Sequence, residues 1–98
     1  MSSEFEFRFH PEFFDDLDIP TKQELEAVNK LIEKIKQNPL RFKRLHGREN
    51  CFSVRAGDLR IIYYVQGRIV WFLLVDRRKH AYENYLKRLY RIKIQLNE

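Results

Sequence analysis

Several features that would point to common protein classes are scarce in this sequence. Its 98 residues include one cysteine, so a disulfide cannot form within the chain and a reducing compartment is expected. No apolar run approaches the roughly 18 residues of a membrane span. The amino-terminal residues lack the basic flank and apolar stretch of a secretory signal. We therefore expect one cytoplasmic domain over residues 1–98, without membrane association.

The motifs of familiar catalytic sites are also missing. The three histidines, His10, His46 and His80, fall on separate predicted elements, and no pair of residues has metal-ligand spacing. We therefore expect no metal and no cofactor. There is no glycine-rich phosphate-binding loop and no nucleophile elbow. What remains is a set of cations with hydroxyl groups and an imidazole, which suits stabilisation of a phosphorane by positioned Arg and Lys.

Positive charge is concentrated in the second half of the chain. Residues 1–40 hold nine acidic and five basic side chains, a net charge of −4. Residues 41–98 hold five acidic and fourteen basic side chains, a net charge of +9. This asymmetry indicates a polyanion or an acidic protein as partner, although a solvated basic surface would give the same composition.

Periodicity predicts an α+β fold with the order β-α-α-β-β-β-α. The expected architecture is a small antiparallel sheet packed by two amino-terminal helices and a carboxy-terminal helix. Phenylalanines alternate with charged residues in the first strand, residues 5–9, and a proline opens a short helix over residues 11–17. The pair Thr21 and Glu24 has capping-box spacing at the start of the second helix, which is expected to stop at Asn38.

A last helix is predicted over residues 81–95. Its expected apolar face consists of Tyr82, Tyr85, Leu86, Leu89 and Ile92. Its expected basic face carries Lys87, Arg88 and Arg91. Trp71, in the preceding strand, either packs under this helix or lines an apolar groove for a partner.

A tight hairpin is predicted around Gly57-Asp58, a pair with the glycine-first chemistry of a two-residue loop. The expected cross-strand pairs are Ala56–Leu59, Arg55–Arg60, Val54–Ile61 and Phe52–Tyr63. Opposed arginines on one sheet face repel each other. An anion between Arg55 and Arg60, such as a phosphate, would remove that repulsion, as would salt bridges to Glu49, Asp58 or Asp76.

A second hairpin is expected at Gln66-Gly67, followed by a strand over residues 68–76. The expected pairs are Tyr64–Ile69, Ile62–Trp71 and Arg60–Leu73. In this arrangement the strand exits toward the first hairpin loop. The basic residues that would then emerge beside Arg55 and Arg60 are Arg77, Arg78, Lys79 and His80.

Three blocks of sequence together resemble the RelE/ParE toxin superfamily, and the RelE-like branch in particular. The blocks are Lys43-Arg44-Leu45-x-Gly47, Cys51-Phe52-x-Val54-Arg55-x-Gly57-x-x-Arg60-Ile61-Ile62-Tyr63-x-Val65, and Val75-Asp76-Arg77-Arg78-Lys79-His80-Ala81-Tyr82. The resemblance covers essentially the whole chain, including the two amino-terminal helices.

The resemblance implies the toxin of a type II toxin–antitoxin system. It implies a ribosome-dependent, metal-independent mRNA endoribonuclease that inhibits translation, in which the 2′-hydroxyl attacks the scissile phosphate. The implied partners are the ribosome, mRNA and a cognate antitoxin from an adjacent gene, RelB-like or other. Any contact with operator DNA would run through the antitoxin complex.

The resemblance also implies roles for individual residues. Arg60 matches the arginine that holds the scissile phosphate, Arg78 the arginine that stabilises the transition state, and Tyr82 the tyrosine that stacks on a base or transfers a proton. Tyr85, one turn on, is an alternative to Tyr82. Ser53 stands where a lysine is usual, and His80 could substitute as general base. The remaining expected RNA contacts are Arg55, Ser53, Arg77, Lys79, Lys43 and Arg44.

Two other functions are compatible with the same motifs. One is a ParE-like inhibitor of DNA gyrase without nuclease activity. The other is a degenerate member that binds only its antitoxin or RNA. The cluster of Arg78, His80 and Tyr82 favours the RelE-like branch, because ParE-type chains generally lack it.

Overall fold

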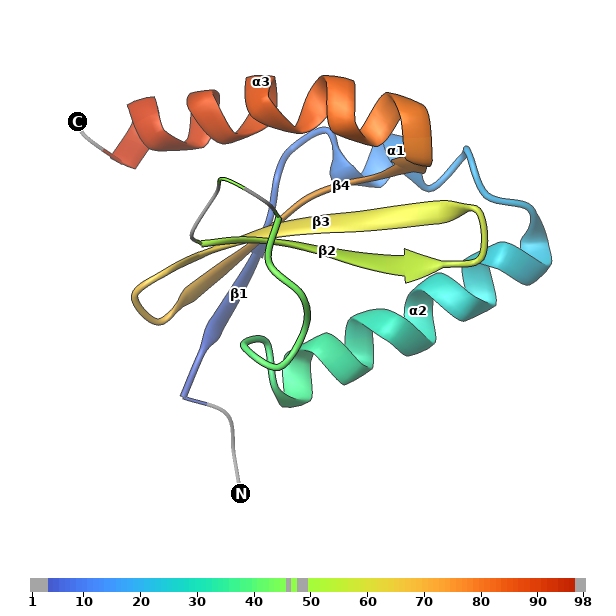
Figure 1. Cartoon of the computed structure of the whole chain (residues 1–98), viewed down its shortest axis with the longest axis horizontal. Coiled ribbons are helices and arrows are strands. Elements are labelled where there is room, and N and C mark those ends of the chain that lie inside the picture. The colour runs from blue at the N-terminus through green and yellow to red at the C-terminus, as the bar shows by residue number, and fades with distance from the viewer. Residues whose placement is uncertain (1–3, 46, 48–49, 97–98) are drawn as a thin grey trace.

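The computed structural model describes residues 4–45, 47 and 50–96. The elements are β1 (Glu6–Phe9), α1 (Phe13–Asp16), α2 (Lys22–Gln37), β2 (Cys51–Ala56), β3 (Leu59–Gln66), β4 (Ile69–Arg77) and α3 (Arg78–Leu96). Both the α+β class and the predicted order of elements are confirmed. In Figure 1, α3 lies along one face of the sheet and α2 along the other.

The sheet is mixed, with the strand order β1-β4-β3-β2. The prediction of an antiparallel sheet was wrong for β1, which runs parallel to β4, whereas β2, β3 and β4 pair antiparallel. Tight loops join β2 to β3 and β3 to β4, and such loops force neighbouring strands to run in opposite directions. Two helices separate β1 from the other strands, so no local loop sets its direction.

The first hairpin has the predicted register. Arg55 lies opposite Arg60 and Ala56 lies opposite Leu59. Gly57 has a φ of +62°, a left-handed value that the glycine-first loop requires.

The predicted register of the second hairpin was wrong. Its loop is Gly67-Arg68, with Gly67 at a φ of +58°, so glycine again comes first. The observed pairs include Gln66–Ile69, Tyr64–Trp71, Tyr63–Phe72, Ile62–Leu74 and Arg60–Asp76. The pairing shifts between Ile62 and Tyr63, which leaves Leu73 as the extra residue of a β-bulge.

Each face of the sheet packs against one of the two long helices. Toward α2, the core contains Val28, Ile32 and Ile35 of the helix with Phe52, Val54, Leu59, Ile61, Tyr63 and Phe72 of the strands. Toward α3, it contains Ile62, Tyr64, Leu73, Leu74, Ala81, Tyr85, Leu89 and Ile92, and Trp71 packs there. Successive residues of β2 and β3 thus face opposite helices, as the two-residue period of a strand requires.

Helix α2 has the predicted ends. The hydroxyl of Thr21 accepts a hydrogen bond from the Glu24 backbone N–H at 3.2 Å, and the Glu24 carboxylate accepts one from Thr21 N–H at 2.9 Å. The helix finishes at Gln37, with Asn38 as its C-cap.

Helix α3 differs from its prediction in three respects. It begins at Arg78, immediately after β4, so this arginine opens the helix instead of lying in a connecting segment. Tyr82 and Leu86 were expected on the buried face but are 39% and 40% exposed. Arg88 was expected on the basic outer face but turns inward to pair with Asp16.

Candidate functional site

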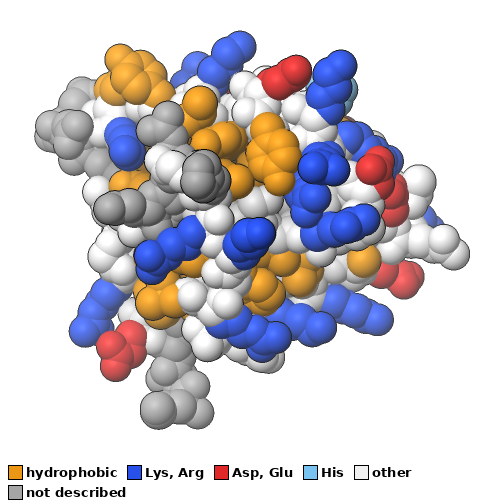
Figure 2. Space-filling model, viewed as in Figure 1, with side chains coloured by type: hydrophobic (Ala, Val, Ile, Leu, Met, Phe, Trp, Pro, Cys, Tyr) orange, Lys and Arg blue, Asp and Glu red, His pale blue; other side chains and the backbone are white. Residues whose placement is uncertain are grey.

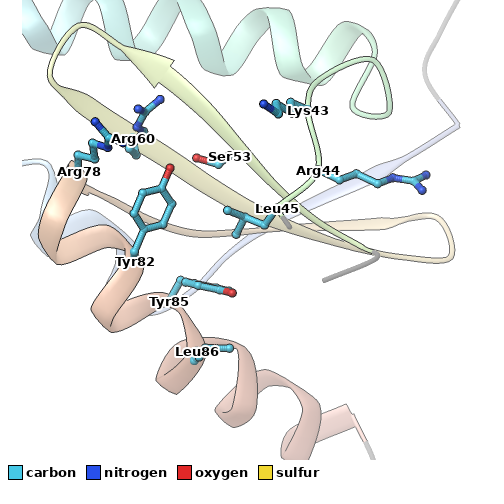
Figure 3. A pocket seen from close by; sticks show the side chains of 9 residues that line it. All are labelled: Lys43, Arg44, Leu45, Ser53, Arg60, Arg78, Tyr82, Tyr85 and Leu86. Atoms are coloured by element: carbon cyan, nitrogen blue, oxygen red, sulfur yellow. The ribbon is translucent and has the colours of Figure 1, made fainter. Parts of the chain in front are cut away.

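A cavity of about 600 Å³ lies between the first turns of α3, the sheet face under that helix and the segment that precedes β2 (Figure 3). It is lined by Lys43, Arg44, Leu45, Ser53, Arg60, Arg78, Tyr82, Tyr85 and Leu86. The β-strands supply its floor, because Ser53 and Arg60 belong to β2 and β3 on the face that α3 covers. Helix α3 supplies one wall, because Arg78 and Tyr82 are four residues apart and so lie on one side of the helix.

Arg60 and Arg78 bring two positive charges to this cavity. Neither forms an ion pair with an acidic side chain within the described residues. Both also line a small adjoining hollow at the first hairpin loop, together with Arg55 and Asp58. The salt bridges considered for Arg60 are not formed with Asp58 or Asp76, and Glu49 lies outside the described residues.

Two hydroxyl groups accompany the arginines. The Ser53 Oγ is buried and has no hydrogen-bond partner among the residues that the structure describes. In Figure 3 the Tyr82 hydroxyl points toward Arg60, and the Ser53 oxygen is turned toward the same region. Tyr85 also lines the cavity but is only 8% exposed and belongs to the core under α3. Of the two tyrosines considered, Tyr82 is therefore the one directed at the arginine pair.

Arg77 points away from the cavity, although it neighbours Arg78 in sequence. It lies opposite Leu59, whose side chain faces α2, and its guanidinium donates two hydrogen bonds to Glu24, at 2.7 and 2.9 Å. The hydrogen bond from Arg77, with those from Thr21, lowers the pKa of Glu24 to about 2. This arginine is thus neutralised at the start of α2.

The other predicted contacts lie at the rim of the cavity or outside it. Arg55 is exposed and donates from Nε to the Gly57 carbonyl at 3.0 Å. Arg44 lines the cavity, but Figure 3 shows its guanidinium pointing away from the arginine pair. Lys79 and His80 are exposed and not among the lining residues, and His80 Nδ1 lies 3.7 Å from Glu83.

Sequence reasoning missed the pair Asp16–Arg88, which anchors the middle of α3. The Asp16 carboxylate binds the Arg88 guanidinium and also accepts a hydrogen bond from Val75 N–H at 3.0 Å. Arg88 donates in addition to the carbonyl of Leu73, the bulge residue, at 2.8 Å. No local sequence signal marks this pair, since its members are 72 residues apart.

The chemistry available in the cavity is recognition of an anion. Two guanidinium groups and a Lys43 ammonium provide charge-assisted donors for phosphate oxygens, and Tyr82 offers an exposed ring that can stack on a base. Within the described residues there is no cluster of three or more His, Cys, Asp or Glu side chains placed to bind a metal ion. In the same part of the chain, no helix has the length and apolar character needed to cross a membrane.

Sequence comparison relates this chain to toxins of toxin–antitoxin systems. Residues 7–82 match the family described as ParE toxin of type II toxin–antitoxin system, parDE. The chain is 34% identical over 88 residues to the candidate toxin RelE1 of Methanocaldococcus jannaschii, covering 82% of this chain and 97% of that relative.

Solved structures agree with these sequence matches. A chain of the toxin–antitoxin complex RelBE2 from Mycobacterium tuberculosis is 31% identical, with a TM-score of 0.62 over 76% of this chain and 98% of that chain. A mutant of the E. coli toxin RelE in the free state is 18% identical and shares the fold, with a TM-score of 0.72 over 90% of this chain and 98% of that chain.

Proposed function

The chain belongs to the RelE/ParE family of toxins from type II toxin–antitoxin systems, and on that premise we propose that it inhibits translation by cutting mRNA on the ribosome. The observation that carries this proposal is the cavity in which Arg60 and Arg78, neither of them ion-paired within the described residues, lie beside the Tyr82 hydroxyl. Surface arginines that serve only solubility need no such convergence, and the neighbouring Arg77 is neutralised by a carboxylate.

In the proposed reaction the 2′-hydroxyl loses its proton and its oxygen attacks the adjacent phosphorus. The bond from phosphorus to the 5′-oxygen breaks, that oxygen takes up a proton, and a 2′,3′-cyclic phosphate remains. Arg60 and Arg78 stabilise the charge that develops on the phosphoryl oxygens, because both line one cavity and neither forms an ion pair within the described residues. Tyr82 stacks on a base or exchanges a proton with the reacting oxygens.

We also assign Lys43 a part in this reaction, as a donor of positive charge to the phosphate oxygens. Ser53, on the cavity floor, cannot supply positive charge, whereas Lys43 lines the same cavity from the neighbouring segment. A hydrogen bond from Ser53 N–H to the Lys43 carbonyl, at 3.2 Å, holds the two backbones together. His80 is less suited to act as general base, because it is exposed outside the cavity lining.

The test is expression of the chain alone, followed by primer extension on cellular transcripts. Growth should stop, and new 5′ ends should arise within coding regions, in register with codons and only on translated messages. Arg60→Ala and Arg78→Ala should each lower cleavage by about 10²–10³. Arg68→Ala is the matched control, because this arginine is exposed and pairs with Glu4 away from the cavity. Full cleavage by the double variant of Arg60 and Arg78 would refute the proposal.

Inhibition of DNA gyrase is the second candidate, and the matching family description, which names ParE, favours it. A gyrase inhibitor would leave transcripts intact while plasmid supercoiling falls. Tyr82→Phe should then have little effect, whereas it should slow an RNA-cleaving toxin if the hydroxyl transfers a proton. Intact transcripts together with relaxed plasmid DNA would identify gyrase as the target.

We also propose a cognate antitoxin as partner. A relative of this chain, at 31% identity, forms part of the toxin–antitoxin complex RelBE2. A protein encoded beside this chain should restore growth when it is expressed together with the toxin, and it should co-purify with the toxin.

A further inference from the structure

Arg77 stands at the junction between β4 and α3, next in sequence to an arginine of the candidate site. Strand β4 ends at Arg77 and α3 begins at Arg78, so no connecting residue separates the strand from the helix. The direction in which β4 ends therefore fixes where the first turns of α3 lie. Because Arg78 and Tyr82 belong to those turns, the placement of both cavity side chains depends on this junction.

The side chain of Arg77 fixes the junction from the opposite face of the sheet. Its two Nη atoms donate to the two carboxylate oxygens of Glu24, at 2.7 and 2.9 Å, and we call this contact the Arg77–Glu24 bridge. Two parallel hydrogen bonds set the orientation of a guanidinium as well as its distance. Glu24 is held in turn, because it exchanges two hydrogen bonds with Thr21 in the capping box of α2. The bridge thus ties the start of α3 to the start of α2.

Two acidic side chains near the cavity are also engaged by Arg77. The Asp76 carboxylate accepts a hydrogen bond from the Arg77 backbone N–H at 2.7 Å, although Asp76 lies opposite Arg60 in the sheet. The Asp58 carboxylate lies 3.6 Å from the Arg77 guanidinium, although Asp58 also lines the small hollow that holds the two cavity arginines. Figure 2 shows acidic side chains beside Lys and Arg at the end of the molecule that carries the first hairpin loop. Arg77 therefore occupies carboxylates that stand close to the cavity arginines.

We propose that Arg77 is a positioning residue of the candidate site. Bound to Glu24, it holds the first turns of α3 so that Arg78 stays directed at a phosphate bound beside Arg60. This inference rests on the proposed function, and it adds a residue that acts on the reaction without touching the RNA. A cation stabilises a transition state only while its place is fixed, and a displacement of about 1 Å can lower a rate about 10²-fold.

A role in stability alone is the competing explanation, and the chain offers variants that distinguish the two. Glu24→Gln removes the charge that holds Arg77, but the glutamine oxygen still accepts the Thr21 N–H, so the capping box remains. Arg77→Lys keeps the positive charge but replaces the forked guanidinium with a single ammonium group. The matched control is Glu33→Gln on the same helix, because Glu33 is 70% exposed and pairs with Lys36 at 3.7 Å.

The experiment measures cleavage of mRNA on ribosomes, at a temperature where circular dichroism shows every variant to be folded. Glu24→Gln and Arg77→Lys should each lower kcat about 10–100-fold and leave KM nearly unchanged, whereas Glu33→Gln should change neither. A double-mutant cycle then identifies the residue through which the bridge acts. With Arg78→Ala present, Glu24→Gln should lower kcat less than about twofold, because the side chain that it positions is gone. With Lys43→Ala present, Glu24→Gln should keep its full effect.

The outcomes separate this inference from the proposed function. Equal losses in the Arg78→Ala and Lys43→Ala backgrounds, or wild-type kcat in Glu24→Gln, would overturn the inference. If the unmodified chain cleaves no mRNA, the proposed function fails, and the inference is judged by titration of the free chain with inorganic phosphate, followed by nuclear magnetic resonance. Glu24→Gln should then weaken phosphate binding at least about threefold, and only while Arg78 is present. Phosphate binding that is absent, or that Glu24→Gln leaves unchanged, would overturn the inference as well.

Discussion

The ion pair between Asp16 and Arg88 is the interaction whose loss should destabilise the fold most. Its side chains are 8% and 16% exposed. The two Nη atoms of Arg88 donate to the two carboxylate oxygens at 2.5 and 2.9 Å. The same pair binds the carbonyl of Leu73, the bulge residue, and the N–H of Val75, two residues further along β4. The ion pair therefore connects α1 and α3 to β4.

The substitution Arg88→Met should lower the free energy of unfolding by about 3–5 kcal/mol. It keeps the length of the side chain but leaves the Asp16 carboxylate buried without a counter-charge, and removal of one partner of a buried pair has that order of effect. The Leu73 carbonyl also loses its guanidinium donor. Because the total stability of a chain of this size is about 5–15 kcal/mol, the loss is a large fraction. The melting temperature should fall by at least about 12 °C.

Urea denaturation followed by circular dichroism measures this difference directly. The matched control is Arg68→Met, because Arg68 pairs with Glu4 at 3.0 Å but the two side chains are 75% and 74% exposed. An exposed pair contributes about 0–1 kcal/mol, so the control should change little. The double variant with Asp16→Asn should lose less stability than the sum of the single variants. A loss in Arg88→Met no larger than in Arg68→Met would refute this reasoning.

Three further predictions concern pH and backbone conformation. The hydrogen bond from Arg77 lowers the pKa of Glu24 from 4.5 to about 2. The ionised Glu24 carboxylate therefore stabilises the fold above pH 4.5, and this contribution is lost as the pH falls toward 2. Thermal melts of Glu24→Gln should lack this acid dependence. Burial, reinforced by the charge of Arg88, lowers the pKa of His10 from 6.5, so stability should decrease as the pH falls below 6.5. In His10→Asn, whose side-chain oxygen can still accept the hydrogen bond from Glu12 N–H, that decrease should disappear from the same melts. Gly67→Ala should cost about 1 kcal/mol in urea denaturation, because φ is +58° while nothing lies within 4 Å of the added methyl group. An unchanged midpoint of urea denaturation in Gly67→Ala would contradict that account.

The sequence by itself determined the features that depend on neighbouring residues. Gly57-Asp58 sets the register of β2 and β3, so the opposition of Arg55 and Arg60 was predictable from the loop alone. Thr21 and Glu24 set the start of α2 through hydrogen bonds within one turn. The family resemblance was visible in the same blocks, because they encode the hairpin and the strand-to-helix junction.

Which site residues come together was predictable in part. Arg60, Arg78 and Tyr82 line one cavity as expected, since a spacing of four residues on a helix keeps Arg78 and Tyr82 on one side. Lys79 and His80 are not among its lining residues, because the helix begins at Arg78 and each further residue rotates about 100° around its axis. Arg77 belongs to the last position of β4, where the side chain points to the other face of the sheet.

Only the tertiary structure decided the contacts between distant segments. The bulge at Leu73 shifts the register of β4, so Arg60 lies opposite Asp76 and not opposite Leu73 as predicted. Asp16 and Arg88 meet only when α1 and α3 pack against that bulge. The parallel pairing of β1 with β4 likewise depends on the path of the chain through α1 and α2, which separate β1 from the other strands. Local periodicity specifies which face of an element is apolar, but the packing of the elements determines which partner each face meets.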